Sequence, residues 1–248
     1  MYFYLFDSFL QDRRYQTEVL RLESRLAQLG LQGRTEKMTI LKNVQEAATS
    51  AIKRGATTVV AVGNDLTVTK LLPIVIEHGL PLGIIPFGQP NTIAEYLGLP
   101  NGVPAADALS RRITKKLDVG QADSQYFLLQ ARLTAPAKIK CDGRYTVETL
   151  DPRDGCLIAN LGSGDPYGQP NDNRLELIVQ PHSTGWSWGQ KQYSAASVFP
   201  VHQAMVQDAG DSAAVVLDGQ ITLKAPTTIG VAKKKLQVIV GPRRTFGD

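Results

Sequence analysis

The sequence predicts an α/β protein with two domains: an N-terminal domain built on a parallel sheet and a C-terminal antiparallel β-sandwich. Two observations carry this prediction. Over residues 1–117, apolar strand-like segments alternate with helical spacings, which is typical of parallel strands joined by crossover helices. From 118 to 248, short alternating strands and turn residues replace that pattern and favour antiparallel pairing.

The first domain begins with an aromatic strand over residues 2–6 (YFYLF). A helix is expected over 13–29, because its apolar residues recur at intervals of three and four and so form one face. The elements expected next are a second helix capped by Thr39, a strand over 58–62 (TVVAV), a third helix from Val68, a strand over 82–86 (LGIIP) and a short helix around 91–97. The two apolar strands have no polar break, as expected for strands covered on both faces.

The second domain is expected to contain eight strands, at 125–133, 137–141, 144–149, 156–160, 175–179, 203–206, 213–217 and 236–240. Two Asp-Gly pairs, Asp142-Gly143 and Asp218-Gly219, are typical of tight hairpin turns. The segments Gly162–Pro170 and Ala225–Gly230 are interrupted by proline and glycine, which favours loops there.

Composition points to a globular cytoplasmic protein. Of the 248 residues, 43% are hydrophobic and 20% are charged, and the apolar N-terminus reads as a first strand because it lacks a basic leader. Cys141 and Cys156 could form one disulfide, but two buried free thiols are the preferred interpretation. The three histidines are scattered, so a zinc site is not expected.

The net charge of +4 comes with three basic clusters: Arg111 to Lys116, Lys233 to Lys235, and Arg243 with Arg244. Such clusters could contact an anionic membrane peripherally, or they could simply be solvated surface. No nucleic-acid-binding motif accompanies them, so we expect no nucleic-acid partner.

The first segment with candidate binding residues is Gly63-Asn64-Asp65-Leu66-Thr67, between an expected buried strand and an expected helix. Ligands of open parallel sheets bind where strands end and helices begin, and a helix N-terminus there attracts anions. Asp65 could hold Mg²⁺ or orient a nucleotide. Alternatively, Asp65 and Thr67 could only cap the helix.

The second such segment is IPFGQPNTIA, residues 85–94. Its Gly88 and Pro90 could be turn chemistry and nothing more. Asn91 could also offer its amide to a ligand at the same edge of the sheet.

Taken together, VVAVGNDLTVTKLL and LGIIPFGQPNTIAEYLGLP resemble the core of the diacylglycerol kinase catalytic domain family. That family has a Gly-Gly-Asp-Gly-Thr loop, followed by a strand that ends in an Ile-Pro-x-Gly-Thr-x-Asn turn. Looser similarities continue through Leu117–Gly120, Gly162–Gly164, Pro170–Glu176 and Val215–Gln220, so the resemblance covers nearly the whole chain.

The resemblance implies an enzyme that uses Mg²⁺ and transfers the γ-phosphoryl group of ATP to a lipid hydroxyl, such as that of diacylglycerol. Nucleotide would be bound by Gly63, Asn64, Asp65, Thr67, Gly88 and Asn91, and Asp65 would also be the metal ligand. Asp218 would be the catalytic base that receives the proton of the acceptor hydroxyl. Positioning and charge neutralisation account for most of such catalysis.

The sequence departs from the family pattern at the positions that carry the chemistry. Asn64 and Leu66 stand where the family has glycine, and Gln89-Pro90 stands where it has Thr-Gly. Thr92 replaces an expected Asp and Gln220 an expected Glu, and Asp7-Ser8 takes the place of an Asn-Pro turn. Leu66 would crowd a phosphate in a left-handed loop, and Pro90 removes one N–H.

Two hypotheses of different class follow. The first is a lipid kinase. The second is a catalytically degenerate relative that keeps the fold and binds an anionic ligand or a lipid. A kinase for a nucleotide or another small-molecule alcohol is a further alternative, because the NAD-kinase family shares the glycine-aspartate loop. The oligomeric state is not predicted.

Overall fold

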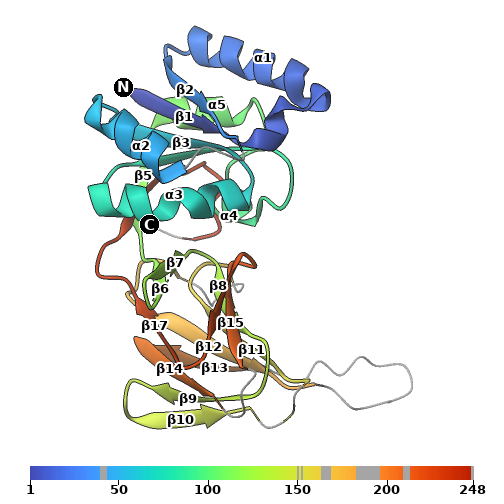
Figure 1. Ribbon diagram of the computed structural model, residues 1–248, viewed down its shortest axis with the longest axis vertical. Coiled ribbons are helices and arrows are strands. Elements are labelled where there is room, and N and C mark those ends of the chain that lie inside the picture. Colours follow the sequence, from blue (N-terminus) through green and yellow to red (C-terminus); the bar gives the residue numbers. More distant parts are fainter. Residues whose placement is uncertain are drawn as a thin grey trace. The chain divides into compact units, whose positions relative to one another are not determined.

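The computed structural model describes residues 1–39, 44–149, 151, 153–162, 169–182, 196–208 and 213–246. The chain forms two compact units (Figure 1). The first comprises residues 1–117 and 234–248, and the second comprises 118–233.

The elements of the first unit are β1 (Tyr2–Phe6), η1 (Ser8–Gln11), α1 (Arg13–Gln28), β2 (Gly33–Lys37), α2 (Val44–Lys53), β3 (Thr58–Gly63), α3 (Asp65–His78), β4 (Leu82–Pro86), α4 (Thr92–Tyr96), α5 (Ala105–Arg111), β5 (Thr114–Leu117) and β18 (Leu236–Ile239). They build a six-stranded sheet in the order β2-β1-β3-β4-β18-β5. All neighbouring strands are parallel except β18 and β5.

Helices cover both faces of this sheet (Figure 1). Helices α1 and α5 pack on the face formed by alternate residues of β1 and β3, such as Tyr4 and Val60. Helices α2 and α3 pack against each other and against the sheet on the other side. Every residue of β3 and β4 is therefore buried, as the uninterrupted apolar sequences predicted.

Six of the predicted elements of this unit are present within a few residues of their expected bounds: β1, α1, β3, α3, β4 and α4. The expected start of the second helix includes residues 40–43, which lie outside the described residues, and α2 is described from Val44. Four elements were not predicted: η1, β2, α5 and β5. Strand β2 has the polar sequence GRTEK because it is an edge strand with mostly exposed side chains, and α5 is only seven residues long.

The division of the chain differs from the expected 1–117 and 118–248 at its C-terminal end. The strand expected over 236–240 is present as β18, but it pairs with β4 and β5 and not with the sandwich. Residues 234–248 therefore belong to the first unit. An apolar strand sequence fits either sheet, so local pattern could not decide this pairing.

The strands of the second unit are β6 (Gly120–Ala122), β7 (Gln125–Phe127), β8 (Gln130–Leu133), β9 (Ala137–Cys141), β10 (Tyr145–Glu148), β11 (Gly155–Ala159), β12 (Leu175–Gln180), β13 (Ser197–Val201), β14 (Gln203–Asp208), β15 (Ala214–Leu217), β16 (Ile221–Lys224) and β17 (Thr227–Val231). They form two six-stranded sheets, β10-β9-β14-β17-β6-β7 and β13-β12-β11-β8-β15-β16. All their pairings are antiparallel.

The core of the second unit combines residues of both sheets. Ile139 and Val206 come from one sheet and Ile158 and Leu177 from the other, and all four are completely buried. The expected antiparallel β-sandwich is thus confirmed.

The two cysteines, Cys141 and Cys156, are buried free thiols, as expected. The predicted Ser163-Gly164 segment and the tryptophans Trp186 and Trp188 lie outside the described residues. Among the described helices, none is both long and apolar enough to span a membrane.

Candidate functional site

The candidate site of the first unit lies where three parallel strands end side by side. Phe6 of β1 is paired with Val62 of β3, and Gly63 is paired with Pro86 of β4. The segments that leave these strands carry all the predicted nucleotide-binding residues: Gly63, Asn64, Asp65, Thr67, Gly88 and Asn91. The structure thus brings these residues to one edge of the sheet, where open α/β sheets bind ligands.

Asp65 ties the two strand-to-helix segments together. It is 4% exposed, and its two carboxylate oxygens accept hydrogen bonds from the N–H groups of Thr92 (2.9 Å) and Ile93 (3.1 Å) at the start of α4. Its own N–H donates to the carbonyl of Pro90. The carboxylate therefore occupies backbone donors that an incoming anion would otherwise use.

Thr67 connects the first segment to β1. Its hydroxyl donates to Oδ2 of Asp7 at 2.6 Å, and both residues are buried. Gly63 makes room for this contact, because a Cβ at that position would collide with the Thr67 hydroxyl. Asp7 was not among the predicted site residues. The signal that could have identified it is an acidic residue directly after a buried strand.

Asn64 and Leu66 do not distort the first segment. Asn64 has φ −102°, caps α3 through its side chain, and donates from Nδ2 to the Gln89 carbonyl at 3.1 Å. Leu66 lies in the first turn of α3 and is half-buried. Neither residue has a positive φ. The glycines that the family has here are therefore not needed for backbone geometry, contrary to the expected strain at Leu66.

The second segment requires one glycine. Gly88 has φ +73°, and Asn91 spans the turn by donating from Nδ2 to the Gly88 carbonyl at 2.6 Å and to Oδ1 of Asn101 at 3.3 Å. Asn101 was not predicted. Oδ1 of Asn91 is buried and has no hydrogen-bond partner among the described residues. A buried acceptor without a donor is costly, so this atom is suited to receive a ligand N–H or O–H.

The backbone of this segment also offers donors. Among the described residues, the N–H groups of Gly88 and Gln89 have no acceptor. Successive backbone N–H groups around a left-handed residue commonly bind anions. The Gly88–Gln89 backbone can therefore receive an anion at this edge, whereas Asp65 occupies the start of α4.

The predicted catalytic residue, Asp218, lies in the second unit, in the turn between β15 and β16. Its Oδ1 accepts from the N–H groups of Leu129 (2.8 Å) and Gln130 (2.9 Å), and its Oδ2 accepts from that of Leu128 (2.8 Å). The carboxylate thereby fixes the connection between β7 and β8. Gln220, in the same turn, is exposed.

Two opposing effects act on the pKa of Asp218. Burial raises the pKa, and the three backbone hydrogen bonds lower it, with burial the stronger effect. The pKa of Asp218 is therefore above its ordinary value. A carboxylate with a raised pKa is a better proton acceptor when ionised, which suits a general base.

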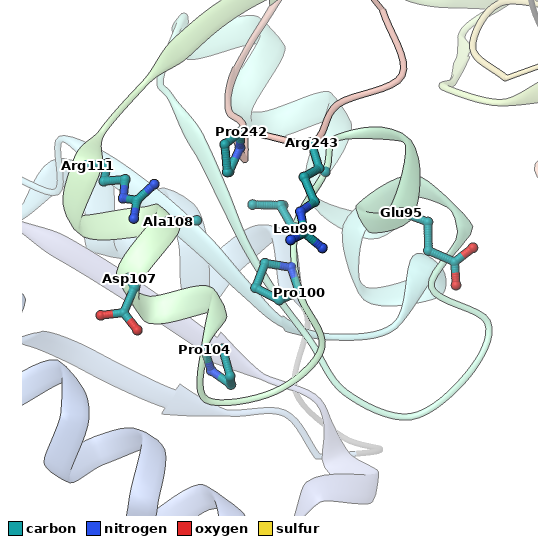
Figure 2. A pocket seen from close by; sticks show the side chains of 10 residues that line it. Glu95, Leu99, Pro100, Pro104, Asp107, Ala108, Arg111, Pro242 and Arg243 are labelled. Atoms are coloured by element: carbon teal, nitrogen blue, oxygen red, sulfur yellow. The ribbon is translucent and has the colours of Figure 1, made fainter.

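A separate hollow of about 420 Å³ lies in the first unit and brings together two of the basic clusters. Apolar side chains line it, with Arg111 and Arg243 at its sides: Leu99, Pro100, Pro104, Ala108 and Pro242. In Figure 2 the Arg243 side chain extends over Leu99 and Pro100, and the Glu95 carboxylate points away from them. The hollow thus combines apolar surface with two cations that are remote in sequence and with two acids, Glu95 and Asp107.

Among the described residues, no three acidic, histidine or cysteine side chains gather closely enough to hold a metal ion. Asp65, the predicted metal ligand, has both carboxylate oxygens on backbone N–H groups. Through these two hydrogen bonds Asp65 positions the two segments.

Comparison with known proteins gives three kinds of similarity. The sequence family of the diacylglycerol kinase catalytic domain matches residues 11–122 of this chain. An uncharacterized protein of Synechocystis is 33% identical over 124 residues, which are 50% of this chain and 26% of that protein. A diacylglycerol kinase of Bacillus subtilis is 29% identical over 140 residues, 51% of this chain and 46% of the relative. The chain thus spans less than half the length of these curated relatives.

Solved structures extend the similarity of fold to both units. The crystal structure of a diacylglycerol kinase from Bacillus anthracis has a TM-score of 0.78 at 19% identity, with 98% of each chain covered. A second crystal structure from that organism, of a diacylglycerol kinase described as putative, has a TM-score of 0.80 at 17% identity, also with 98% of each chain covered. At such identities the likeness concerns the fold alone.

Proposed function

We propose that this chain, which belongs to the diacylglycerol kinase catalytic domain family, is a lipid kinase that transfers the γ-phosphoryl group of ATP to a lipid hydroxyl such as that of diacylglycerol. The observation that carries the proposal is the joining of the two segments at the strand ends. Asp65 and Asn64 hold the second segment against the first, where a nucleotide of an α/β domain is expected.

The nucleotide would use the groups left available at this edge. The Gly88 and Gln89 N–H groups would receive phosphate oxygens, and Oδ1 of Asn91 would accept from the ribose or the base. Gly63 leaves room for the Thr67 hydroxyl to contact Asp7 at this edge of the sheet. Asp65 positions the two segments that follow β3 and β4. Phosphoryl transfer depends chiefly on such positioning.

Asp218 would act as the general base. Its raised pKa suits acceptance of the acceptor hydroxyl proton, and its three backbone hydrogen bonds hold the carboxylate in a fixed direction. A carboxylate has about four lone-pair positions, and three are engaged here, so one is left for the hydroxyl.

A kinase of this family is expected to use a divalent cation together with ATP. Each carboxylate oxygen of Asp65 accepts one backbone hydrogen bond, from Thr92 or from Ile93, so the role that we propose for Asp65 is to position the two segments. We therefore assign it no step through a metal. Magnesium is commonly held by phosphate oxygens and water, with few protein ligands.

Two other features, one at the surface and one in the core, support further parts of the proposal. Arg111 and Arg243 beside the apolar hollow would bring the protein to an anionic membrane that contains the acceptor lipid. The buried free thiols Cys141 and Cys156 are consistent with a reducing, cytoplasmic location.

The test is calorimetric titration with Mg-ATP, followed by turnover with diacylglycerol in mixed micelles. Wild type should bind with a Kd between about 1 μM and 1 mM. Asn91→Ala should weaken binding about threefold to tenfold, because one hydrogen bond is lost. Thr114→Ala, an exposed change in the same unit, is the control. Saturable binding of Mg-ATP with a Kd that Asn91→Ala leaves unchanged would refute the placement of the nucleotide.

A second candidate function is favoured by one specific observation. Asp65 occupies the first N–H groups of α4, and Pro90 has none to offer, so the phosphate site is reduced. A catalytically degenerate relative that binds an anionic ligand or a lipid would fit this arrangement. This second function would be selected over the kinase if the protein bound lipid but did not bind Mg-ATP at about 1 mM, which is the upper end of common KM values.

A further inference from the structure

The second unit contains a hollow that is separate from the residues discussed so far. It has a volume of about 500 Å³ and lies where the chain leaves β13 and enters β14. Since β13 belongs to one sheet of the sandwich and β14 to the other, this is a corner between the sheets. Three segments meet there: the β9–β10 turn, the residue before β12, and the corner itself. We call this hollow the corner site. Its lining residues are Asp142, Arg144, Tyr145, Arg174, Pro200, His202 and Gln203.

The backbone of the corner site is fixed by Asp142. Its Oδ1 accepts from the N–H groups of His202 (3.0 Å) and Gln203 (2.8 Å), and its Oδ2 lies 3.6 Å from Nδ1 of His202. The N–H of Asp142 donates to the Gln203 carbonyl. These hydrogen bonds hold the β9–β10 turn against the corner. The backbone positions of the residues that line the hollow are therefore fixed.

The charge of the corner site is positive. Arg144 and Arg174 come from different segments, and neither guanidinium has an acidic partner among the described residues. The acid that lines the hollow, Asp142, is engaged by backbone donors. The imidazole of His202 lines the same hollow and can add a ring N–H donor.

The chemistry of these cations selects the class of ligand. A guanidinium presents planar pairs of N–H donors that match the spacing of phosphate oxygens. Two guanidiniums that line one hollow can therefore donate hydrogen bonds to one phosphate from two sides. The volume lies within the usual range of small-molecule sites, so it exceeds what bare phosphate needs. Tyr145, 40% exposed, adds an aromatic surface beside the cations for the organic part of a ligand.

We propose that the corner site binds a phosphate group carried by an organic molecule, through Arg144, Arg174 and His202. The phosphate could belong to a soluble phosphate monoester or to the headgroup of a phospholipid; both have the same oxygens. The proposal does not depend on the kinase function, because no residue of the corner site belongs to the proposed nucleotide or acceptor machinery.

The first test is titration with inorganic phosphate at constant ionic strength, monitored by NMR chemical shifts. Arg144→Gln and Arg174→Gln should each weaken saturable binding about tenfold or more, because each removes charged hydrogen bonds. Arg132→Gln removes the same charge from an exposed position on β8 and is the matched control. Equal losses in all three variants, or shifts that do not saturate, would overturn the proposal.

A variant that should gain affinity sharpens the test. Asp142→Asn removes the negative charge of the corner site, while the amide oxygen can still accept from both His202 and Gln203 because a single oxygen does so now. Phosphate should therefore bind several-fold more tightly. Unchanged or weaker binding, with the fold intact by circular dichroism, would contradict the proposed charge arrangement.

Two further arms separate the sources of the phosphate. Glycerol 3-phosphate represents the soluble monoester, and phosphatidylcholine vesicles with and without phosphatidic acid represent the headgroup. Binding that Arg144→Gln and Arg174→Gln abolish but Arg132→Gln leaves intact would assign the site to whichever probe shows it. Failure of both organic probes would reject an organic phosphate as the ligand.

Discussion

The second unit contains two hairpin turns with nearly the same sequence and backbone, Asp142-Gly143 and Asp218-Gly219. The aspartates have φ +48° and +47°, and the glycines have φ +68° and +70°. In both turns three residues join strands that pair directly, Cys141 with Tyr145 and Leu217 with Ile221. The sequence therefore predicted both turns equally well.

The carboxylates of the two turns are used differently. Asp142 engages two N–H groups through a single oxygen, at a surface corner where 21% of its side chain is exposed. Asp218 engages three N–H groups through both oxygens, and it is buried. The difference shows that a turn motif fixes the backbone, whereas its surroundings decide what the side chain does.

The pKa values of the two aspartates move in opposite directions. Burial would raise the pKa of Asp142, but hydrogen bonds from the Gln203 and His202 N–H groups and from the His202 side chain lower it below its ordinary value. For Asp218, burial outweighs the hydrogen bonds and raises the pKa. Two aspartates at the same position of the same kind of turn therefore differ in how readily they accept a proton.

The largest difference is expected when each aspartate is replaced by asparagine. At position 218 the amide nitrogen must face at least one buried backbone N–H, so Asp218→Asn should cost about 2–3 kcal/mol of unfolding free energy. At position 142 the amide oxygen can replace the engaged carboxylate oxygen, so Asp142→Asn should cost less than about 0.5 kcal/mol. Urea unfolding at neutral pH measures both. Equal losses would show that the number of engaged oxygens does not matter.

A smaller, opposite pair of effects is expected from pH. Asp142 has a lowered pKa, so its contribution to stability is present above the unfolded value of about 3.9 and is lost as the pH falls through its folded pKa. Asp142→Asn should therefore flatten the loss of stability in acid, as measured by urea midpoints.

Asp218 should have the opposite effect on the pH dependence of stability, because its pKa is raised. Between the unfolded value of about 3.9 and its folded pKa, the native state holds more protons, so this group lowers stability as the pH rises. Asp218→Asn should remove that decline over the same urea series. Slopes of the same sign for both aspartates would contradict the assigned directions.

What the sequence could predict depends on the distance of the partners along the chain. The strands over 58–62 and 82–86 were predictable because both are β-branched and apolar runs without a charged residue, as expected for strands covered on both faces. The pairing of β18 was not, because its partners lie more than one hundred residues earlier.

The same limit applies to the candidate site. Asn64, Asp65, Gly88 and Asn91 could be placed together because they follow neighbouring strands. The engagement of Asp65 at the start of α4 could not be foreseen, because hydrogen-bond partners of side chains require coordinates. The metal-binding role predicted for Asp65 stays a prediction, whereas its contacts with the second segment are an observation of the structure.

The smallest difference is expected between the two glycines. Gly143 and Gly219 have almost equal positive φ, and a Cβ at either position would meet no atom within 4 Å. Gly143→Ala and Gly219→Ala should each cost about 1–2 kcal/mol, the strain of alanine in a left-handed conformation, and the two costs should agree. Urea unfolding of both variants measures this. A clearly larger loss at Gly219 would mean that the backbone of that turn, and not only its carboxylate, supports the β7–β8 connection.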